Sequence, residues 1–159
     1  MRLCGCTCSG HNGSLKIFVY FVGKPRDEHS NAIAEEFMKR TSRWAACQMR
    51  EINAETLDPW AKHTAAVKIG LDPAGRVMDS PKLAGLFRGW EDSGQDVAFV
   101  IGGHDGLAPA WRARGVANPN DVMLLSLSAM TFPHELARAM LAEQIYRALA
   151  TLRGHPYPR

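Results

Sequence analysis

Two segments of the chain end a buried strand in small or polar residues, a pattern that indicates a ligand pocket built from main chain. Residues 124–138 read LLSLSAMTFPHELAR: an apolar strand, a loop of small residues, and a helix that begins near Pro133. Residues 97–107 read VAFVIGGHDGL, an apolar strand that runs into glycines. A third apolar strand, 65–71, ends in the turn residues DPAG at 72–75. Because ligands of parallel α/β sheets bind outside the carboxyl ends of the strands, we expect these ends to share one pocket.

The polar side chains in these loops match no complete catalytic motif. The glycine loop 102–106 lacks the lysine of a P-loop, so a simple turn remains the alternative to a phosphate site. Ser126 and Ser128 lie outside a Gly-x-Ser-x-Gly elbow and fit polar positions in a tight loop. His134 fits a helix entry after Pro133. No pair of histidines has metal-ligand spacing with supporting carboxylates, so we predict no catalytic metal.

The composition favours one globular domain. The chain has 159 residues, of which 46% are hydrophobic and 22% charged. It contains no apolar run near the roughly 20 residues of a membrane helix, and residues 1–14 lack the apolar core of a secretory signal. We therefore expect a cytoplasmic protein with no membrane partner.

The charge distribution is more informative than its total. The net charge is +3, from 19 basic and 16 acidic residues, which is too small to establish nucleic-acid binding. Basic residues cluster, however, at Lys39, Arg40, Arg43 and Arg50, and again at Arg138, Arg147, Arg153 and Arg159 against Glu143 alone. In a dimer these clusters could join into a stripe that follows phosphates. Ordinary solvated helix faces are the alternative.

The cysteines do not form a recognised zinc motif. Cys4, Cys6 and Cys8 alternate near His11, without the paired C-x-x-C spacing of structural zinc sites. We interpret residues 1–14 as a flexible leader with reduced thiols. Cys47 falls in an expected strand and should be packed.

The remaining chain alternates strands with helices. The expected strands are 15–22, 47–53, 65–71, 97–101 and 122–127, and the expected helices are 27–41, 80–92 and 133–152, with a short helix possible at Asp58-Pro59. Strand 15–22 is a nearly continuous apolar run and should be buried. The inner helix faces should include Ile33, Phe37 and Leu136. Ser80 should cap the second helix. This alternation predicts a single α/β domain over 15–159, with a mostly parallel sheet covered on both faces.

Five motifs, in this order and spacing, resemble one known family. They are Leu71-Asp72-x-x-Gly75, Asp79-Ser80-Pro81-x-Leu83-Ala84, Val100-Ile101-Gly102-Gly103-x-x-Gly106-Leu107, Leu125-Ser126-x-Ser128-x-Met130-Thr131-Phe132-Pro133-His134 and Glu143-Gln144-x-Tyr146-Arg147-Ala148. Over about residues 15–157 the chain resembles the large-subunit ribosomal RNA methyltransferase H family of the SPOUT superfamily. Those enzymes methylate N3 of a pseudouridine in 23S rRNA.

The resemblance implies a fold, a cofactor and partners. It implies a SPOUT-type sheet with a C-terminal trefoil knot, S-adenosyl-L-methionine (SAM) as cofactor, and a homodimer that acts on 23S rRNA in the assembled ribosome rather than on DNA. The positions that match the family's SAM contacts are Leu71, Gly102, Leu127, Ser128, Ala129, Met130, Thr131 and Phe132. Replacing Gly102 by Leu should then abolish SAM binding and leave the protein folded.

The chemistry implied is direct methyl transfer to a deprotonated ring nitrogen, which requires close positioning and a proton acceptor. In the tail, His155 and Tyr157 are the candidates for substrate contact, and Arg153 and Arg159 for phosphate contact. A surface tail position is the alternative for His155.

The chain departs from the family pattern in three places. Pro158 stands where the family usually has a histidine, the segment between Glu51 and Lys68 is short and lacks a lysine-rich helix, and residues 1–14 have no counterpart. Three other functions therefore remain open: a SPOUT methyltransferase with another RNA target, a catalytically weak ribosome-binding protein of the same fold, and a nucleotide-binding module that uses the loop 102–106.

Overall fold

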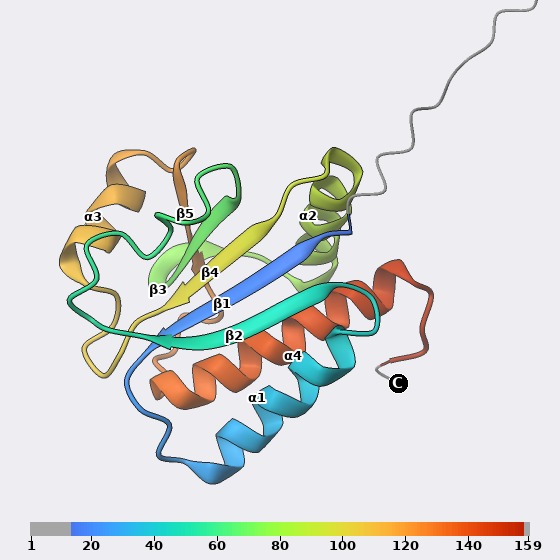
Figure 1. Cartoon of the computed structure of the whole chain (residues 1–159), viewed down its shortest axis with the longest axis horizontal. Coiled ribbons are helices and arrows are strands. Elements are labelled where there is room, and N and C mark those ends of the chain that lie inside the picture. The colour runs from blue at the N-terminus through green and yellow to red at the C-terminus, as the bar shows by residue number, and fades with distance from the viewer. Residues whose placement is uncertain (1–13, 158–159) are drawn as a thin grey trace, which may run out of the picture.

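Five parallel strands form the sheet, in the spatial order β2-β1-β4-β3-β5 (Figure 1). The computed structural model describes residues 14–157. The strands are β1 (Lys16–Val22), β2 (Ala46–Ile52), β3 (Val67–Val77), β4 (Val97–Ile101) and β5 (Val122–Ser126). The expected α/β fold with a parallel sheet is confirmed. The proposed leader, with Cys4, Cys6 and Cys8, lies outside the described residues apart from Ser14.

Helices lie on both faces of the sheet, as predicted. The first face carries α1 (Glu28–Thr41), α2 (Ser80–Ser93) and α4 (His134–Leu152), and the second carries α3 (Pro109–Ala117). The two cores divide along β4, where alternate side chains point in opposite directions. Phe99 belongs to the core under α1, α2 and α4, whereas Ala98 and Val100 pack with Trp111 of α3.

The three expected helices are confirmed within a residue or so at each end. The Asp27 side chain caps α1 by accepting hydrogen bonds from the main-chain N–H groups of His29 and Ser30. The prediction that Ser80 caps α2 is wrong, because the Asp79 side chain accepts from Lys82 N and Ser80 is the first helical residue. Gly94 ends α2 in the left-handed conformation, with φ of 66°.

Two predictions between the main elements are also wrong. Helix α3 was not expected, although Pro109 at its first turn is a helix-start signal. Conversely, residues 59–62 form turns and not a short helix. Asp58 Oδ1 accepts from Trp60 N, and the indole of Trp60 is fully buried and donates to the carbonyl of Ala98. Residues 53–66 therefore cross the second face without a helix.

Strand β3 contains a large bulge. Leu71 and Arg76 both pair with Leu125, so residues 72–75 loop out of the ladder and the strand then resumes. Gly75 lies where a Cβ would come within 2.6 Å of the Leu124 carbonyl carbon. The DPAG sequence is therefore a bulge inside the strand, and not the end of the strand.

Burial on β1 and on two helices differs from the prediction. Ile17, Val19 and Phe21 are buried, but Phe18 and Tyr20 are only half-buried because no described helix covers their side of β1. Ile33 on α1 and Leu136 on α4 were expected inside, yet they are 47% and 39% exposed. Cys47 is packed as expected, and burial raises the pKa of its thiol. No helix among residues 14–157 is long and apolar enough to cross a membrane.

Candidate functional site

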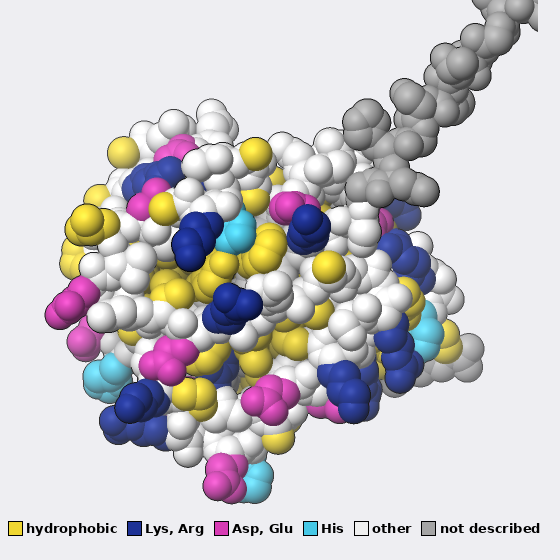
Figure 2. Space-filling model, in the orientation of Figure 1, with side chains coloured by type: hydrophobic (Ala, Val, Ile, Leu, Met, Phe, Trp, Pro, Cys, Tyr) yellow, Lys and Arg dark blue, Asp and Glu magenta, His cyan; other side chains and the backbone are white. Residues whose placement is uncertain are grey.

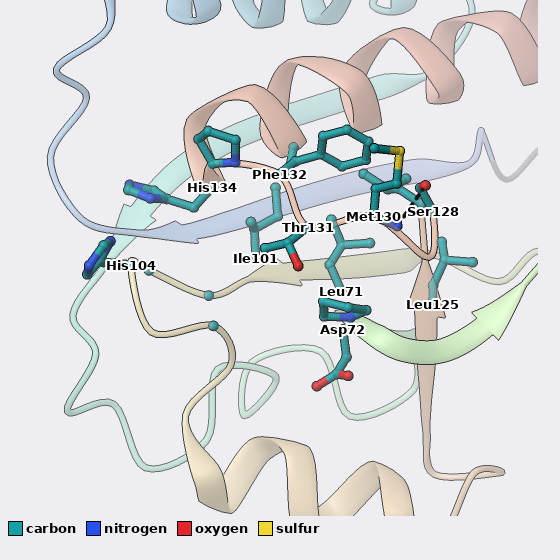
Figure 3. Close-up of a pocket in the computed structure, with 17 residues that line it drawn as sticks. Leu71, Asp72, Ile101, His104, Leu125, Ser128, Met130, Thr131, Phe132 and His134 are labelled. Carbon is teal, nitrogen blue, oxygen red and sulfur yellow. Dashed lines mark hydrogen bonds between the residues drawn. The ribbon is translucent and has the colours of Figure 1, made fainter.

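A cavity of about 560 Å³ lies at the carboxyl ends of β3, β4 and β5 (Figure 3). Its lining comes from the bulge of β3, from the glycine loop after β4, and from the segment between β5 and the first turns of α4. These are the three segments that the strand ends predicted. The volume is in the range of small-molecule sites.

The structure brings most of the predicted cofactor positions together. Those that line the cavity are Leu71, Gly102, Leu127, Ser128, Met130, Thr131 and Phe132. Ala129 does not line it, and its side chain is exposed. The sequence pattern therefore found the segment correctly but could not tell which residue of a tight loop turns outward.

Main-chain packing shapes the glycine loop. A Cβ on Gly102 would lie 2.0 Å from the carbonyl oxygen of Gly106, and Gly106 has φ of 81°. A bulky residue at 102 would therefore force this backbone apart. The Gly102→Leu variant would therefore distort the loop as well as the cavity, so a loss of SAM binding in it would not report on the cavity alone.

Side-chain hydrogen bonds fix the loop after β5. The buried Ser126 hydroxyl donates to the Ser128 carbonyl at 2.8 Å, and Ser128 Oγ accepts from Met130 N at 3.0 Å. Both serines thus hold a tight turn, as expected, and neither has a neighbouring base that would make it a nucleophile. This arrangement holds the main chain of residues 127–131 at the cavity wall.

Apolar side chains and one ion pair complete the walls. Leu71, Ile101 and Phe132 present apolar surface to the cavity. At one edge Asp72 is buried, and it accepts hydrogen bonds from Ala74 N at 2.8 Å and from Arg112 Nε at 2.7 Å. Its carboxylate is therefore already paired. A mostly apolar cavity with main-chain polar groups suits a planar heterocycle better than a phosphate.

Two histidines stand at the cavity mouth that the predicted site did not include. Figure 3 shows His104 and His134 on the same side of the cavity, opposite Met130 and Ser128. His134 is the first residue of α4, and His104 belongs to the glycine loop. In the sequence, His104 follows the glycines after a predicted strand, and His134 follows Pro133 at the start of a predicted helix. These positions could have identified both histidines as residues of the site.

The tail residues lie far from the cavity within one chain. Helix α4 has 19 residues, and the cavity is at its first turn while the tail follows its last. At 1.5 Å per residue this separates the two by about 28 Å. Figure 1 shows the last turn of α4 away from the carboxyl ends of the strands. The structure therefore does not bring His155 and Tyr157 to the cavity of their own chain.

Contacts with α1 and α4 hold the tail. The Tyr157 hydroxyl donates to Glu143 Oε1 at 2.9 Å, and the same oxygen accepts from Arg147 Nε at 2.9 Å. The His155 ring packs edge-on against Trp44, with centroids 5.6 Å apart. Burial raises the pKa of Tyr157, and the hydrogen bond to Glu143 raises it further, so its hydroxyl keeps its proton at neutral pH.

The two arginines predicted to contact phosphates are Arg153 and Arg159, and only Arg153 lies in the described part of the chain. Arg153 forms a two-nitrogen ion pair with Glu91 at 2.5 Å and 3.0 Å, so phosphate contact would require that exposed pair to open. Arg159 lies outside the described residues. Within residues 14–157, no group of three or more His, Cys, Asp or Glu side chains could hold a metal ion.

A parallel sheet with a mostly apolar cavity at its carboxyl ends defines a small-molecule-binding α/β domain. The family model described as "Predicted SPOUT methyltransferase" matches residues 15–158. The chain therefore belongs to the SPOUT methyltransferase family.

Named relatives extend over nearly the whole chain. The ribosomal RNA large subunit methyltransferase H of Solibacter usitatus is 59% identical over 145 residues, covering 91% of this chain and 100% of the relative. The protein of the same name from Cereibacter sphaeroides is 38% identical, covering 91% and 99%. A solved methyltransferase from Legionella pneumophila, in complex with SAM, aligns with a TM-score of 0.49 and 16% identity over 85% of this chain and 67% of that one.

Proposed function

We propose that the protein transfers a methyl group from SAM to N3 of a pseudouridine in 23S rRNA of the assembled ribosome, with residues 15–159 acting as one domain. The observation that carries the proposal is the cavity at the ends of β3, β4 and β5, in a chain of a methyltransferase family. The names of its relatives supply the class of RNA.

The cavity fits SAM by its shape and its chemistry. Main-chain groups of residues 127–131 and of Gly102 can bond an adenine edge, and Leu71, Ile101 and Phe132 can enclose the ring. SAM supplies an activated methyl group on a sulfonium. The chain's own part is to hold the reactants in contact and to exclude water, which can lower the barrier by several kcal/mol. We also infer a trefoil knot in this region, from the membership of the chain in the SPOUT family.

The distance between cavity and tail supports a homodimer. The surface between them on α1 and α4 has a second cavity of about 550 Å³, bordered by the exposed side chains of Ile33 and Leu136 and by Met140. A two-fold axis near the middle of α4 would pack two such surfaces together. The first turn of α4 in one subunit would then lie near the last turn of α4 in the other. Each cavity would then receive the partner's tail.

In such a dimer the tail would contact the nucleobase across the subunit boundary. Tyr157 keeps its proton and donates it to Glu143 Oε1, so we assign its hydroxyl oxygen as the acceptor of a hydrogen bond from the base. His155 has an imidazole at an exposed position and is our candidate proton acceptor in the place of the histidine that Pro158 replaces. Arg153 and Arg159 would contact phosphates.

The direct test is methylation of ribosomes that lack the modification. Purified protein, labelled SAM and ribosomes from a strain with the gene deleted should yield one methylated pseudouridine by mass spectrometry of 23S fragments. Ala137→Phe should abolish transfer and SAM binding, because Ala137 lines the cavity from α4 and a phenyl ring would fill it. Ala137→Ser is the matched control and should keep both.

Each alternative predicts a different result. Methyl incorporation into another RNA would favour a SPOUT enzyme with a different target. Ribosome and SAM binding without transfer would favour a catalytically weak ribosome-binding protein. An absence of SAM binding by calorimetry in the wild-type protein would contradict the proposal itself.

A further inference from the structure

Half-buried aromatic side chains lie on the second face of the sheet, over β1, where none of the described helices covers them. Phe18 and Tyr20 point to this side, because the alternate residues of β1 pack under α1 and α4. Their rings are parallel within 5°, with centroids 6.5 Å apart. The imidazole of His63 lies 4.1 Å from the Phe18 ring and accepts or donates a 2.6 Å hydrogen bond with the Tyr20 hydroxyl. Ring packing and this hydrogen bond therefore hold the three rings together as one cluster.

The edge strand β2 adds polar and basic side chains beside this cluster. Gln48 pairs with Phe18 and Arg50 with Tyr20 in the parallel ladder, so each pair shares a face, and both β2 side chains are exposed. Trp60 covers the neighbouring part of β4, where its indole donates to the Ala98 carbonyl. Figure 2 shows this side of the molecule, where hydrophobic side chains gather in a hollow near Lys and Arg side chains and a histidine.

We propose that this surface binds an unpaired segment of the RNA substrate outside the methyl-transfer cavity. We call it the aromatic face and define it by Phe18, Tyr20, Gln48, Arg50, Lys62 and His63. The inference rests on the proposed function, because it assigns a second contact to the same RNA. Aromatic rings for base stacking, with an amide and cations beside them, are the side chains that hold single-stranded RNA.

The charges on the aromatic face favour a nucleic acid over an apolar partner. Arg50 and Lys62 are exposed, and neither forms an ion pair with a described residue. The nearby carboxylate of Asp96 accepts a hydrogen bond from Lys16 N. Burial lowers the pKa of His63 and outweighs the opposing effect of Asp96, which favours the neutral form of the ring that packs on Phe18. Two unpaired cations beside aromatic rings complement phosphates next to bases.

The aromatic face is continuous with the mouth of the cavity. Val22, two residues beyond Tyr20 on the same side of β1, packs against Gly103, where a Cβ would lie 3.1 Å from Val22 Cγ1. Gly103 and His104 line the cavity. An RNA strand on β1 would therefore reach the cavity mouth along a single surface. The base that stacks on this face would be a near neighbour of the target nucleotide.

Binding of a fluorescein-labelled oligouridylate to the full chain, followed by anisotropy, tests the proposal. Phe18→Leu removes a stacking ring and should weaken binding about fivefold or more. Arg50→Gln should lower the slope of log K against log salt by about 0.7, the value for one phosphate contact on a single strand. Arg88→Gln, an exposed arginine on α2 at the opposite face, is the matched control and should leave the slope unchanged.

The outcomes separate this inference from the proposed function. If Phe18→Leu and Arg50→Gln bind RNA within twofold of wild type, or if wild type does not bind the oligouridylate, the aromatic face is not an RNA site. If instead Arg50→Gln changes the oligomeric state, the face is a protein interface and the proposal is overturned. SAM affinity, measured on the same samples, reports on the cavity alone. If Phe18→Leu does not fold, the salt dependence of oligouridylate binding by Arg50→Gln decides between the two outcomes, because Arg50 is exposed.

Discussion

Single residues in the tail and on the sheet have roles that depend on their neighbours. Glu143 Oε1 accepts hydrogen bonds from the Tyr157 hydroxyl and from Arg147 Nε. These contacts fix the position of the phenol ring beside the carboxylate and the guanidinium group. Because the pKa of Tyr157 is raised, its hydroxyl keeps the proton that it donates to Glu143 and is unsuited to remove a proton at neutral pH. This favours His155 for the proton in the proposed reaction.

His63 should make the stability of the protein depend on pH. Burial lowers its pKa in the folded state below the ordinary value of 6.5, so below about pH 6.5 the unfolded chain binds the proton more readily. The stabilising contribution of neutral His63 is therefore present above this pH and lost as the pH falls. We expect the free energy of unfolding of wild type to decrease from pH 7.5 to pH 5 more steeply than that of His63→Gln. Urea unfolding at both pH values measures this, and equal slopes would contradict it.

Residue types and spacing predicted the three segments that line the cavity, but only some of the residues in its lining. The strand ends that precede these segments are visible in the sequence, whereas the individual positions 127–132 and Gly102 were implied by the resemblance to the family. That Ala129 turns outward depends on hydrogen bonds of Ser126 and Ser128, which the spacing does not specify. Leu136 has the apolar type of a core residue, and its exposure depends on what packs against α4.

Among the elements, the bulge of β3 positions one wall of the cavity. Residues 72–75 leave the ladder and return to it, and both Leu71 and Arg76 pair with Leu125. Asp72 Oδ1 closes the bulge by accepting from Ala74 N. The bulge therefore directs Leu71, Asp72 and Pro73 to the cavity.

Gly75→Ala should destabilise the protein and displace this wall. The added Cβ would come 2.6 Å from the Leu124 carbonyl carbon, and backbone there cannot yield as a side-chain end would. We expect a loss of about 1–3 kcal/mol in the free energy of unfolding. Gly85→Ala, on α2 with nothing within 4 Å, is the control and should raise stability by roughly 0.5–1 kcal/mol. Chemical denaturation compares the two, and a neutral Gly75→Ala would show that the bulge can relax.

The elements missed from the sequence share a physical cause. Helix α3 has nine residues and a weakly amphipathic pattern, and it depends on Trp111 packing against β4 and β5. Strand β1 is apolar apart from Lys16, which predicted burial on both sides, but residues 53–66 cover its second side only in part, through His63. Helix α4 was predictable because it is long and has a start signal at Pro133 and a stop signal at Gly154.

For the whole molecule, a site shared between two chains should allow complementation. An Ala137→Phe chain lacks a usable cavity, and a chain cut after Gly154 lacks the tail, so each homodimer should be inactive. A heterodimer of the two, isolated with two different tags, contains one intact cavity facing one intact tail. We expect about half of wild-type activity from it, because one of two equivalent sites is restored. An inactive heterodimer that still binds SAM would show that the tail does not act across the boundary.

In this arrangement, the length of helix α4 sets the distance between the cavity and the tail, which are the two parts of the composite site. One inserted residue would move its far end by about 1.5 Å and swing it by about 100° around the axis, and a symmetric pair would incur the error twice. Length changes during evolution should therefore be excluded from α4. The crossing at residues 53–66 does not set this distance, so a length change there should alter the contacts of Lys62 and His63 on the aromatic face and leave the spacing of cavity and tail unchanged.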